Sequence, residues 1–174
     1  VIKNRKVCGD PNCSGGFRFI GNSPAKNKLS YFDVWKEFSS MFKKFNYAAI
    51  DRYPAVSRWN PTTDFTIASI SAFQPFVVSG EVKPPANPLV IPQFCLRFED
   101  IDNVGITGSH MTGFVMIGQH MFVQPHEWNQ NKVFGEIHQW LRKGLGLPNE
   151  EITFHEDAWA GGGNLGPWME FFSR

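Results

Sequence analysis

The sequence lacks the features that mark membrane and secreted proteins. It contains no apolar run of about 18 residues, so no membrane-spanning helix is expected. It starts at Val1 without a recognisable secretory signal. Only three cysteines occur in 174 residues, which excludes a disulfide framework. A sparse and odd number of cysteines is typical of a reducing compartment, and we therefore expect a cytoplasmic location.

Strong charge of either sign is also missing. Lys and Arg number 17, Asp and Glu number 16, and the formal net charge is +1. A protein that binds RNA over much of its surface would be more basic, so any RNA contacts should come from local patches or from regions outside this chain. Apolar residues make up 42% of the chain, and 17 residues are Phe. This composition predicts one domain with a buried core.

Two alternating segments, 94–99 and 110–117, are the most informative part of the sequence. Successive side chains of a strand face opposite sides of a sheet, so each segment is predicted to be a strand. Five side chains then share one surface of a hairpin: Arg97, Glu99, His110, Phe114 and Met116. The loop between the strands is longer than the roughly two to five residues usual for hairpins, which favours a functional loop.

The chemistry of this surface suits a nucleotide. A guanidinium offers phosphate oxygens a planar, bidentate contact. A carboxylate can accept a hydrogen bond from an exocyclic amino group, and an aromatic ring gives a base a stacking partner. The residues alone are equally compatible with an ordinary hairpin whose charged face is solvated, and both interpretations stay open at this point.

The same residues resemble a motif of the class II aminoacyl-tRNA synthetases. The motif runs through Arg97-Phe98-Glu99, a variable loop and His110-Met111-Thr112-Gly113-Phe114. The surrounding sequence, CLRFEDIDNVGITG followed by GQHMF, resembles the alanyl-tRNA synthetase family in its archaeal form. The resemblance implies an α+β fold, with an antiparallel sheet flanked by helices. It also implies a ligase of protein biosynthesis that uses ATP and Mg²⁺ to activate alanine and transfers the alanine to tRNA(Ala).

By this resemblance, residues of the hairpin have individual roles. Arg97 would hold the α-phosphate of ATP as the catalytic residue, and Phe114 would stack on adenine. Glu99 or Asp100 would contact the adenosine end, and His110 completes the ATP-binding motif.

The resemblance also suggests an alanine pocket. Met116 and Trp159 would form its walls, although without the resemblance both read equally well as core residues. Asn164 and Glu170 lie in two short segments that resemble the family, WAGGGN and GPWME, and they are weaker candidates for the same pocket. By itself, Asn164 after three glycines reads as a turn former.

Some family features are not found. The family's third motif, with its second ATP-binding arginine, does not occur before Arg174, and Ser109 stands where archaeal relatives commonly have Arg. We therefore expect part of a catalytic domain, with a partner chain as one source of the third motif and with tRNA contacts outside this chain. The alternative is a non-catalytic synthetase-like module that binds nucleotide, RNA or a partner subunit.

We divide the chain into an N-terminal segment, 1–29, and a partial class II catalytic domain, 30–174. The first segment contains Cys8 and Cys13, which resemble half of a zinc site. Structural zinc needs four ligands, and a second cysteine pair is missing, so a complete zinc site within this chain is not expected.

The first half of the second segment should contain helix and strand. Aromatic residues recur every three or four positions over Tyr31–Phe45, which predicts an amphipathic helix that begins at a capping box. We expect a strand over 47–53, a helix within 64–78 that Pro75 ends or kinks, and an extended connector over 82–92.

Beyond the hairpin, one more helix and two strands are predicted. Apolar residues over 134–145 share one helix face, and Pro148 stops the helix. The residues at 151–157 alternate as in a strand, 158–167 should form a glycine-rich turn, and 168–172 should begin another strand.

Overall fold

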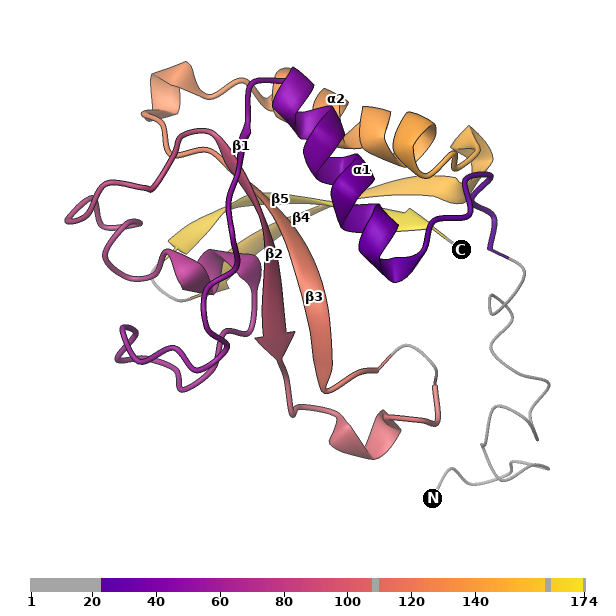
Figure 1. Cartoon of the computed structure of the whole chain (residues 1–174). Coiled ribbons are helices and arrows are strands. Elements are labelled where there is room, and N and C mark those ends of the chain that lie inside the picture. Colours follow the sequence, from indigo (N-terminus) through magenta and orange to yellow (C-terminus); the bar gives the residue numbers. More distant parts are fainter. Residues whose placement is uncertain (1–22, 108–109, 162–163, 174) are drawn as a thin grey trace.

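The structure is a computed structural model that describes residues 23–107, 110–161 and 164–173. The cysteine pair Cys8 and Cys13 lies outside the described residues, as does Ser109. In the described part, helices pack against sheets, which confirms the predicted α+β class with an antiparallel hairpin (Figure 1). The helices and strands are, in chain order, α1 (Tyr31–Lys44), β1 (Ala48–Ala49), β2 (Leu89–Leu96), β3 (Gly113–His120), α2 (Gln130–Gln139), β4 (Ile152–Gly161) and β5 (Asn164–Ser173).

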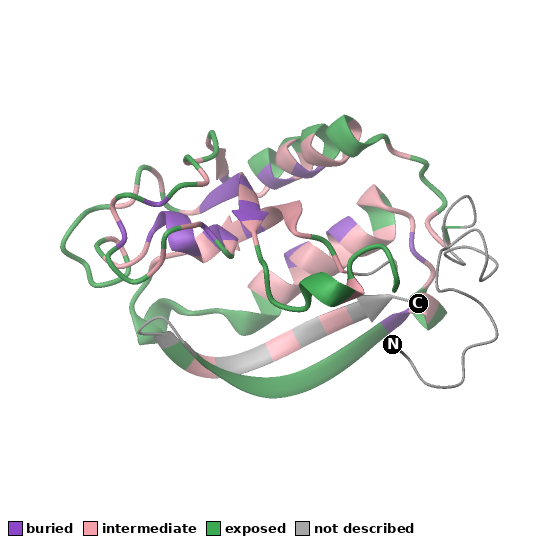
Figure 2. Ribbon diagram, turned by 90° about the horizontal axis from the view of Figure 1, so that it is seen from below, coloured by how far each residue is buried: buried purple, intermediate pink, exposed green. Residues whose placement is uncertain are grey.

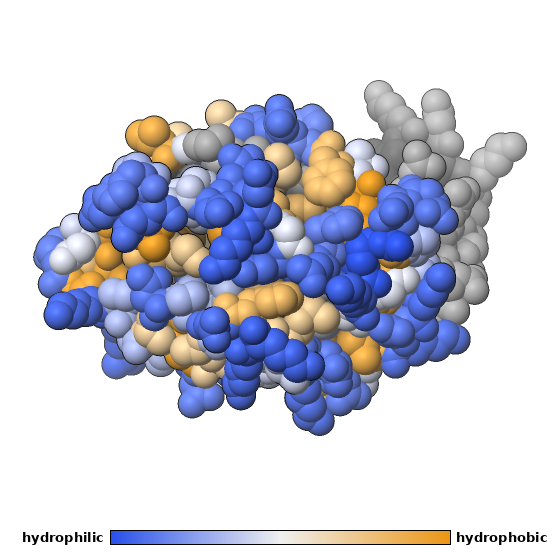
Figure 3. Space-filling view, turned by 90° about the horizontal axis from the view of Figure 1, so that it is seen from above, coloured by the Kyte–Doolittle hydropathy of each residue, from blue (hydrophilic) through white to orange (hydrophobic). Residues whose placement is uncertain are grey.

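Helix α1 begins at Tyr31, as predicted, and ends at Lys44, one residue before the predicted end. The Ser30 hydroxyl accepts a hydrogen bond from the Asp33 backbone N–H at 3.3 Å, which satisfies one of the free donors at the helix start. The polar side of α1 faces solvent. The face of the molecule that is seen from above is mostly hydrophilic, with apolar side chains in separate patches (Figure 3). The other side of α1 buries Phe38 and Phe42.

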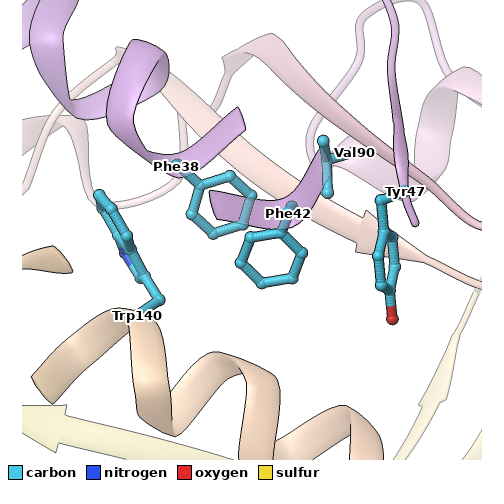
Figure 4. Packing of buried hydrophobic residues seen from close by; sticks show 5 residues of the cluster. All are labelled: Phe38, Phe42, Tyr47, Val90 and Trp140. Atoms are coloured by element: carbon cyan, nitrogen blue, oxygen red, sulfur yellow. The ribbon is translucent and has the colours of Figure 1, made fainter. Parts of the chain in front are cut away.

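The main core lies between α1, the sheet and the end of α2. It consists of Phe38, Phe42, Tyr47, Val90 and Trp140 (Figure 4). The rings of Phe38 and Phe42 are stacked with centroids 4.1 Å apart, and Trp140 meets Phe38 edge-on at 5.2 Å. Each fully buried side chain of this size stabilises the fold by about 1.5–3 kcal/mol. The aromatic stripe of α1 therefore fixes the helix on the sheet.

Strands β1, β2 and β3 form one sheet in that order. β1 is parallel to β2 and pairs only through Ala48 and Ala49, so the strand expected over 47–53 is much shorter than predicted. β2 and β3 are antiparallel, with Leu89 opposite His120 and Leu96 opposite Gly113. The hairpin is thus confirmed, but both strands are displaced: β2 starts and ends earlier than predicted, and β3 begins only at Gly113, so His110 lies before it.

The shift corrects two predictions. Residues 89–92, predicted as part of a connector, belong to β2, and β2 ends at Leu96, so Arg97 and Glu99 lie beyond the strand. Leu89, Val90 and Ile91 are all buried, because both faces of the sheet are covered at this point. A strand that is buried on both faces shows no apolar alternation, which is why the pattern did not reveal its start.

The segment 64–78 contains only a short 3₁₀ helix at Ser69–Ala72, before Pro75. Its Ala72 and the neighbouring Phe73 pack on Leu89 and Ile91, on the sheet face opposite α1. The predicted stop at Pro75 agrees with this short helix, because proline has no backbone N–H to donate.

The β4–β5 hairpin forms a second, two-stranded sheet. It lies along the outside of the molecule, and most of β4 is exposed (Figure 2). It meets α2 through two aromatic contacts: the ring centroids of Phe134 and Phe171 lie 5.9 Å apart, and those of His138 and Phe154 lie 6.1 Å apart. The predicted turn at 158–167 is wrong for most of its length, because Ala158 pairs with Pro167 and the ladder continues to Gly161 and Asn164.

Candidate functional site

One cavity of about 580 Å³ opens where β2 and β3 meet their connecting loop. Five residues predicted to contact ATP line it together: Arg97, Glu99, Asp100, His110 and Phe114. Ile67 and Met111 complete the lining. Because β2 and β3 are antiparallel, the end of β2 and the start of β3 lie side by side and bring the two halves of the motif together.

Arg97 is fixed at two points although its side chain is exposed. Its Nε–H donates to the carbonyl oxygen of Ile67 at 2.8 Å, and its backbone N–H donates to the Thr112 carbonyl at 3.0 Å. The guanidinium carbon lies 5.2 Å from the centre of the Phe114 ring. Among the residues that the structure describes, the two terminal nitrogens of Arg97 have no hydrogen-bond partner. They are the nitrogens that form a bidentate contact with an anion.

The acidic residues follow directly after the arginine. Glu99 and Asp100 are both exposed. Asp100 adopts a left-handed backbone with φ 57°, which is uncommon for a residue with a side chain, and its carbonyl accepts from the Asn103 N–H at 2.8 Å. The chain therefore turns at Asp100, which itself lines the cavity.

His110 marks the return of the loop. Its Nδ1 lies 2.6 Å from the Thr107 hydroxyl, and its backbone N–H donates to the same oxygen at 3.3 Å. These two contacts hold the imidazole at the rim of the cavity beside Phe114.

The predicted alanine-pocket residues are not brought together in the same way. Met116 lies on the same face of β3 as Phe114, and its sulfur accepts from the Ser69 N–H at 3.3 Å. Trp159 lies in β4, half exposed, opposite Gly166. Within the described ranges, no ladder joins β3 to the β4–β5 hairpin. The backbones of Asn164 and Glu170 lie in β5, and their side chains fall outside the described part.

Further along β3, a compact group was not anticipated from the sequence. The His120 Nε2 lies 3.1 Å from the Ser69 hydroxyl, and its ring lies 4.9 Å from that of Phe73. Burial lowers the pKa of His120 to about 4, so the imidazole is neutral near pH 7. Gly118 permits this packing, because a Cβ there would lie 2.5 Å from the Ser69 oxygen. The signal in the sequence is Gly118 itself.

Metal ligands are sparse in the described part of the chain. It contains no group of three or more His, Cys, Asp or Glu side chains that could hold a metal ion. Burial raises the pKa of the Cys95 thiol, which favours the protonated form over the thiolate that binds metals. Neither α1 nor α2, nor any other helix in the described ranges, combines the length and apolarity that a membrane crossing requires.

Comparison with known proteins gives a consistent result. A family model described as "tRNA synthetases class II (A)" matches residues 33–172. A relative named alanine–tRNA ligase, from Methanocella arvoryzae, is 51% identical over 172 residues, which is 98% of this chain and 20% of the relative. Relatives with the same name from Methanopyrus kandleri and Cenarchaeum symbiosum are 46% and 43% identical, over 95% and 100% of this chain and 18% and 20% of theirs. The chain thus spans about a fifth of the length of these curated relatives.

Proposed function

Because the chain belongs to the class II (A) tRNA synthetase family, we propose that it is the ATP-binding portion of an alanine–tRNA ligase. The observation that carries the proposal is the shared cavity of Arg97, Glu99, Asp100, His110 and Phe114. Within the relatives the name alanine–tRNA ligase belongs to a much longer protein. We therefore assign the tRNA(Ala) contacts and the third class II motif to regions or chains beyond residues 1–174. Within this chain we assign the catalytic portion to residues 30–174.

The first step of the proposed reaction joins two anions. The carboxylate of alanine attacks the α-phosphorus of ATP, and the bond to pyrophosphate breaks, which leaves alanyl adenylate. The protein has to hold both reactants close together and to stabilise the negative charge that develops on the phosphoryl oxygens. No covalent protein nucleophile is needed.

Arg97 meets the electrostatic requirement. Its Nε–H is bonded to the Ile67 carbonyl, which leaves the two terminal nitrogens of a cavity-lining side chain for the phosphate. A guanidinium fixed before the reaction stabilises the transition state without reorganising. Mg²⁺ bound to the phosphates would neutralise further charge.

The remaining residues of the cavity are assigned by their chemistry. Phe114 offers one face to adenine, and Glu99 or Asp100 accepts hydrogen bonds from the adenosine end. His110, which Thr107 holds through its ring nitrogen, is assigned to ATP binding as another residue of the lining. For alanine we propose Met116 with Trp159, Asn164 and Glu170, which requires the β4–β5 hairpin to approach the face of β3 that carries Met116.

The test is amino-acid-dependent exchange of pyrophosphate with ATP, run with all twenty amino acids. We expect exchange with alanine, and Arg97→Ala should reduce its rate by a factor of about 100 to 1,000. Arg58→Ala is the matched control, because Arg58 is also exposed but does not line the cavity. Equal exchange rates for Arg97→Ala and the unchanged protein would contradict the proposal. A complete lack of exchange would exclude autonomous activation and favour a nucleotide-binding module or a split enzyme.

A further inference from the structure

The anchor of Arg97 is a backbone atom thirty residues earlier in the chain. The carbonyl oxygen of Ile67 accepts the Nε–H of Arg97 at 2.8 Å. A guanidinium has one Nε–H and two terminal NH₂ groups, so this contact leaves the two terminal NH₂ groups for an anion. The position of the Ile67 carbonyl therefore determines the orientation of these two groups.

Thr66, the residue before Ile67, is itself held by hydrogen bonds. Its backbone N–H donates to the Ala55 carbonyl at 2.8 Å, and its own carbonyl accepts from the Leu96 N–H at 2.9 Å. Its hydroxyl donates to the Phe94 carbonyl at 2.7 Å. Thr66 is completely buried, although its neighbour Ile67 is exposed. The segment that carries the Ile67 carbonyl is thus bonded to the end of β2 immediately before Arg97.

Gln93 completes the same network from inside β2. Pairing between β1 and β2 stops early, and beyond it the Gln93 carboxamide takes the place of strand hydrogen bonds. It accepts from the Tyr53 N–H at 3.0 Å and donates to the Tyr53 carbonyl at 3.1 Å. The same NH₂ group also lies 3.2 Å from the Thr66 hydroxyl and 3.0 Å from the Phe94 carbonyl. Gln93 is fully buried, so each of these polar atoms depends on its protein partners.

We propose that Thr66, supported by Gln93, is a positioning residue for phosphate binding by Arg97. The proposal rests on the ATP site proposed above. An exposed arginine otherwise has many side-chain conformations, and ordering it opposes binding. The buried network places one acceptor, the Ile67 carbonyl, so that the side chain of Arg97 is ordered before ATP arrives. ATP affinity then depends on a hydroxyl that does not contact ATP.

The test is calorimetric titration of ATP into the purified protein and three threonine variants. Thr66→Val removes the hydroxyl while keeping the shape, and it should weaken ATP binding about tenfold, because Arg97 would then have to be ordered when ATP binds. Thr66→Ser keeps the hydroxyl and should stay within roughly twofold of the unchanged protein. Thr62→Val is the control, since it removes a hydroxyl from the same segment, bonded to Asn60 and remote from Arg97.

Each substitution is then repeated in an Arg97→Ala background. If Thr66 acts through Arg97, Thr66→Val has no further effect on ATP affinity there. An equal loss with and without Arg97 would overturn the inference, because the hydroxyl would then support only the fold. The proposed function fails separately, and this inference with it, if Arg97→Ala itself leaves ATP affinity unchanged.

A measurement on the unchanged protein avoids any folding defect of the variants. The Nε–H proton of Arg97 should be protected from solvent exchange in the absence of ATP, because the Ile67 carbonyl accepts it. Free exchange of that proton, comparable to the exposed Arg58, would show that the anchor does not exist in solution and would refute the proposal.

Discussion

The buried hydrogen bonds between α2 and the sheet give the sharpest test of the fold. Glu136 of α2 is 6% exposed, and its carboxylate accepts from the Tyr47 hydroxyl at 2.7 Å and from the Gln119 side chain at 3.0 Å. The same amide nitrogen of Gln119 lies 2.7 Å from the Tyr47 oxygen. Burial, followed by the hydrogen bond to Glu136, raises the pKa of Tyr47, so its proton stays in place to be donated.

Tyr47→Phe removes one donor from a buried carboxylate and keeps the ring in the core. A hydrogen bond to a charged group contributes about 1.5–3 kcal/mol, so we expect the free energy of unfolding to fall by about 2 kcal/mol. With a urea dependence of about 2 kcal/mol per molar for a small domain, the midpoint should move down by about 1 M. Far-ultraviolet circular dichroism in urea measures this shift.

Tyr31→Phe is the control, since Tyr31 is 66% exposed at the start of α1. Its midpoint should stay where it is. A double-mutant cycle with Glu136→Gln should give a coupling of about 1 kcal/mol or more between the two positions. Equal midpoints for Tyr47→Phe and Tyr31→Phe, with no coupling to Glu136, would refute the reasoning.

Two further predictions concern the group around Ser69. The pKa of His120, about 4 in the fold, lies below the unfolded value of about 6.5, so the unfolded chain binds the proton more readily in that range. The stability that His120 contributes is therefore complete above pH 6.5 and is lost as the pH falls to 4, by up to roughly 3 kcal/mol. Urea titrations across this pH range measure the free energy of unfolding of the unchanged protein and of His120→Gln, and the two values should converge at low pH. A constant difference between the two proteins over the whole range would contradict the assignment. Gly118→Ala places a Cβ 2.7 Å from the Ser69 Cβ, so the free energy of unfolding, measured by thermal denaturation, should fall by about 1–3 kcal/mol. Gly135→Ala is the control, because a Cβ added there meets nothing within 4 Å, and it should not be destabilising.

The structure brings the predicted ATP-contact residues together in one cavity but does not do so for the predicted alanine-pocket residues. The ATP-contact residues predicted from the motif come together because the antiparallel register of β2 and β3 brings Leu96 opposite Gly113. The sequence predicts the pairing of these two strands, but the bounds of both strands and their register became visible only in the structure. The alanine residues depend on where the β4–β5 hairpin lies relative to β3, and no local pattern specifies the distance between two sheets.

Sequence by itself determined the elements whose causes are local. Helix α1 is set by the Ser30 cap and by aromatic residues spaced for one face, and both signals lie within the helix or next to it. The choice of Arg97 and Phe114 came from the resemblance to the class II synthetase motif, and both residues line the same cavity.

Only the tertiary structure decided which polar groups became buried. Gln93, Thr66 and Glu136 look in the sequence like ordinary solvent-facing residues, and all three are buried with partners distant in the chain. The acceptor for Arg97 is a main-chain carbonyl, which every residue possesses and which therefore leaves no trace in the sequence. Such contacts arise from the packing of segments far apart in the chain, and for that reason the anchor of the proposed phosphate-binding arginine becomes visible only in the folded molecule.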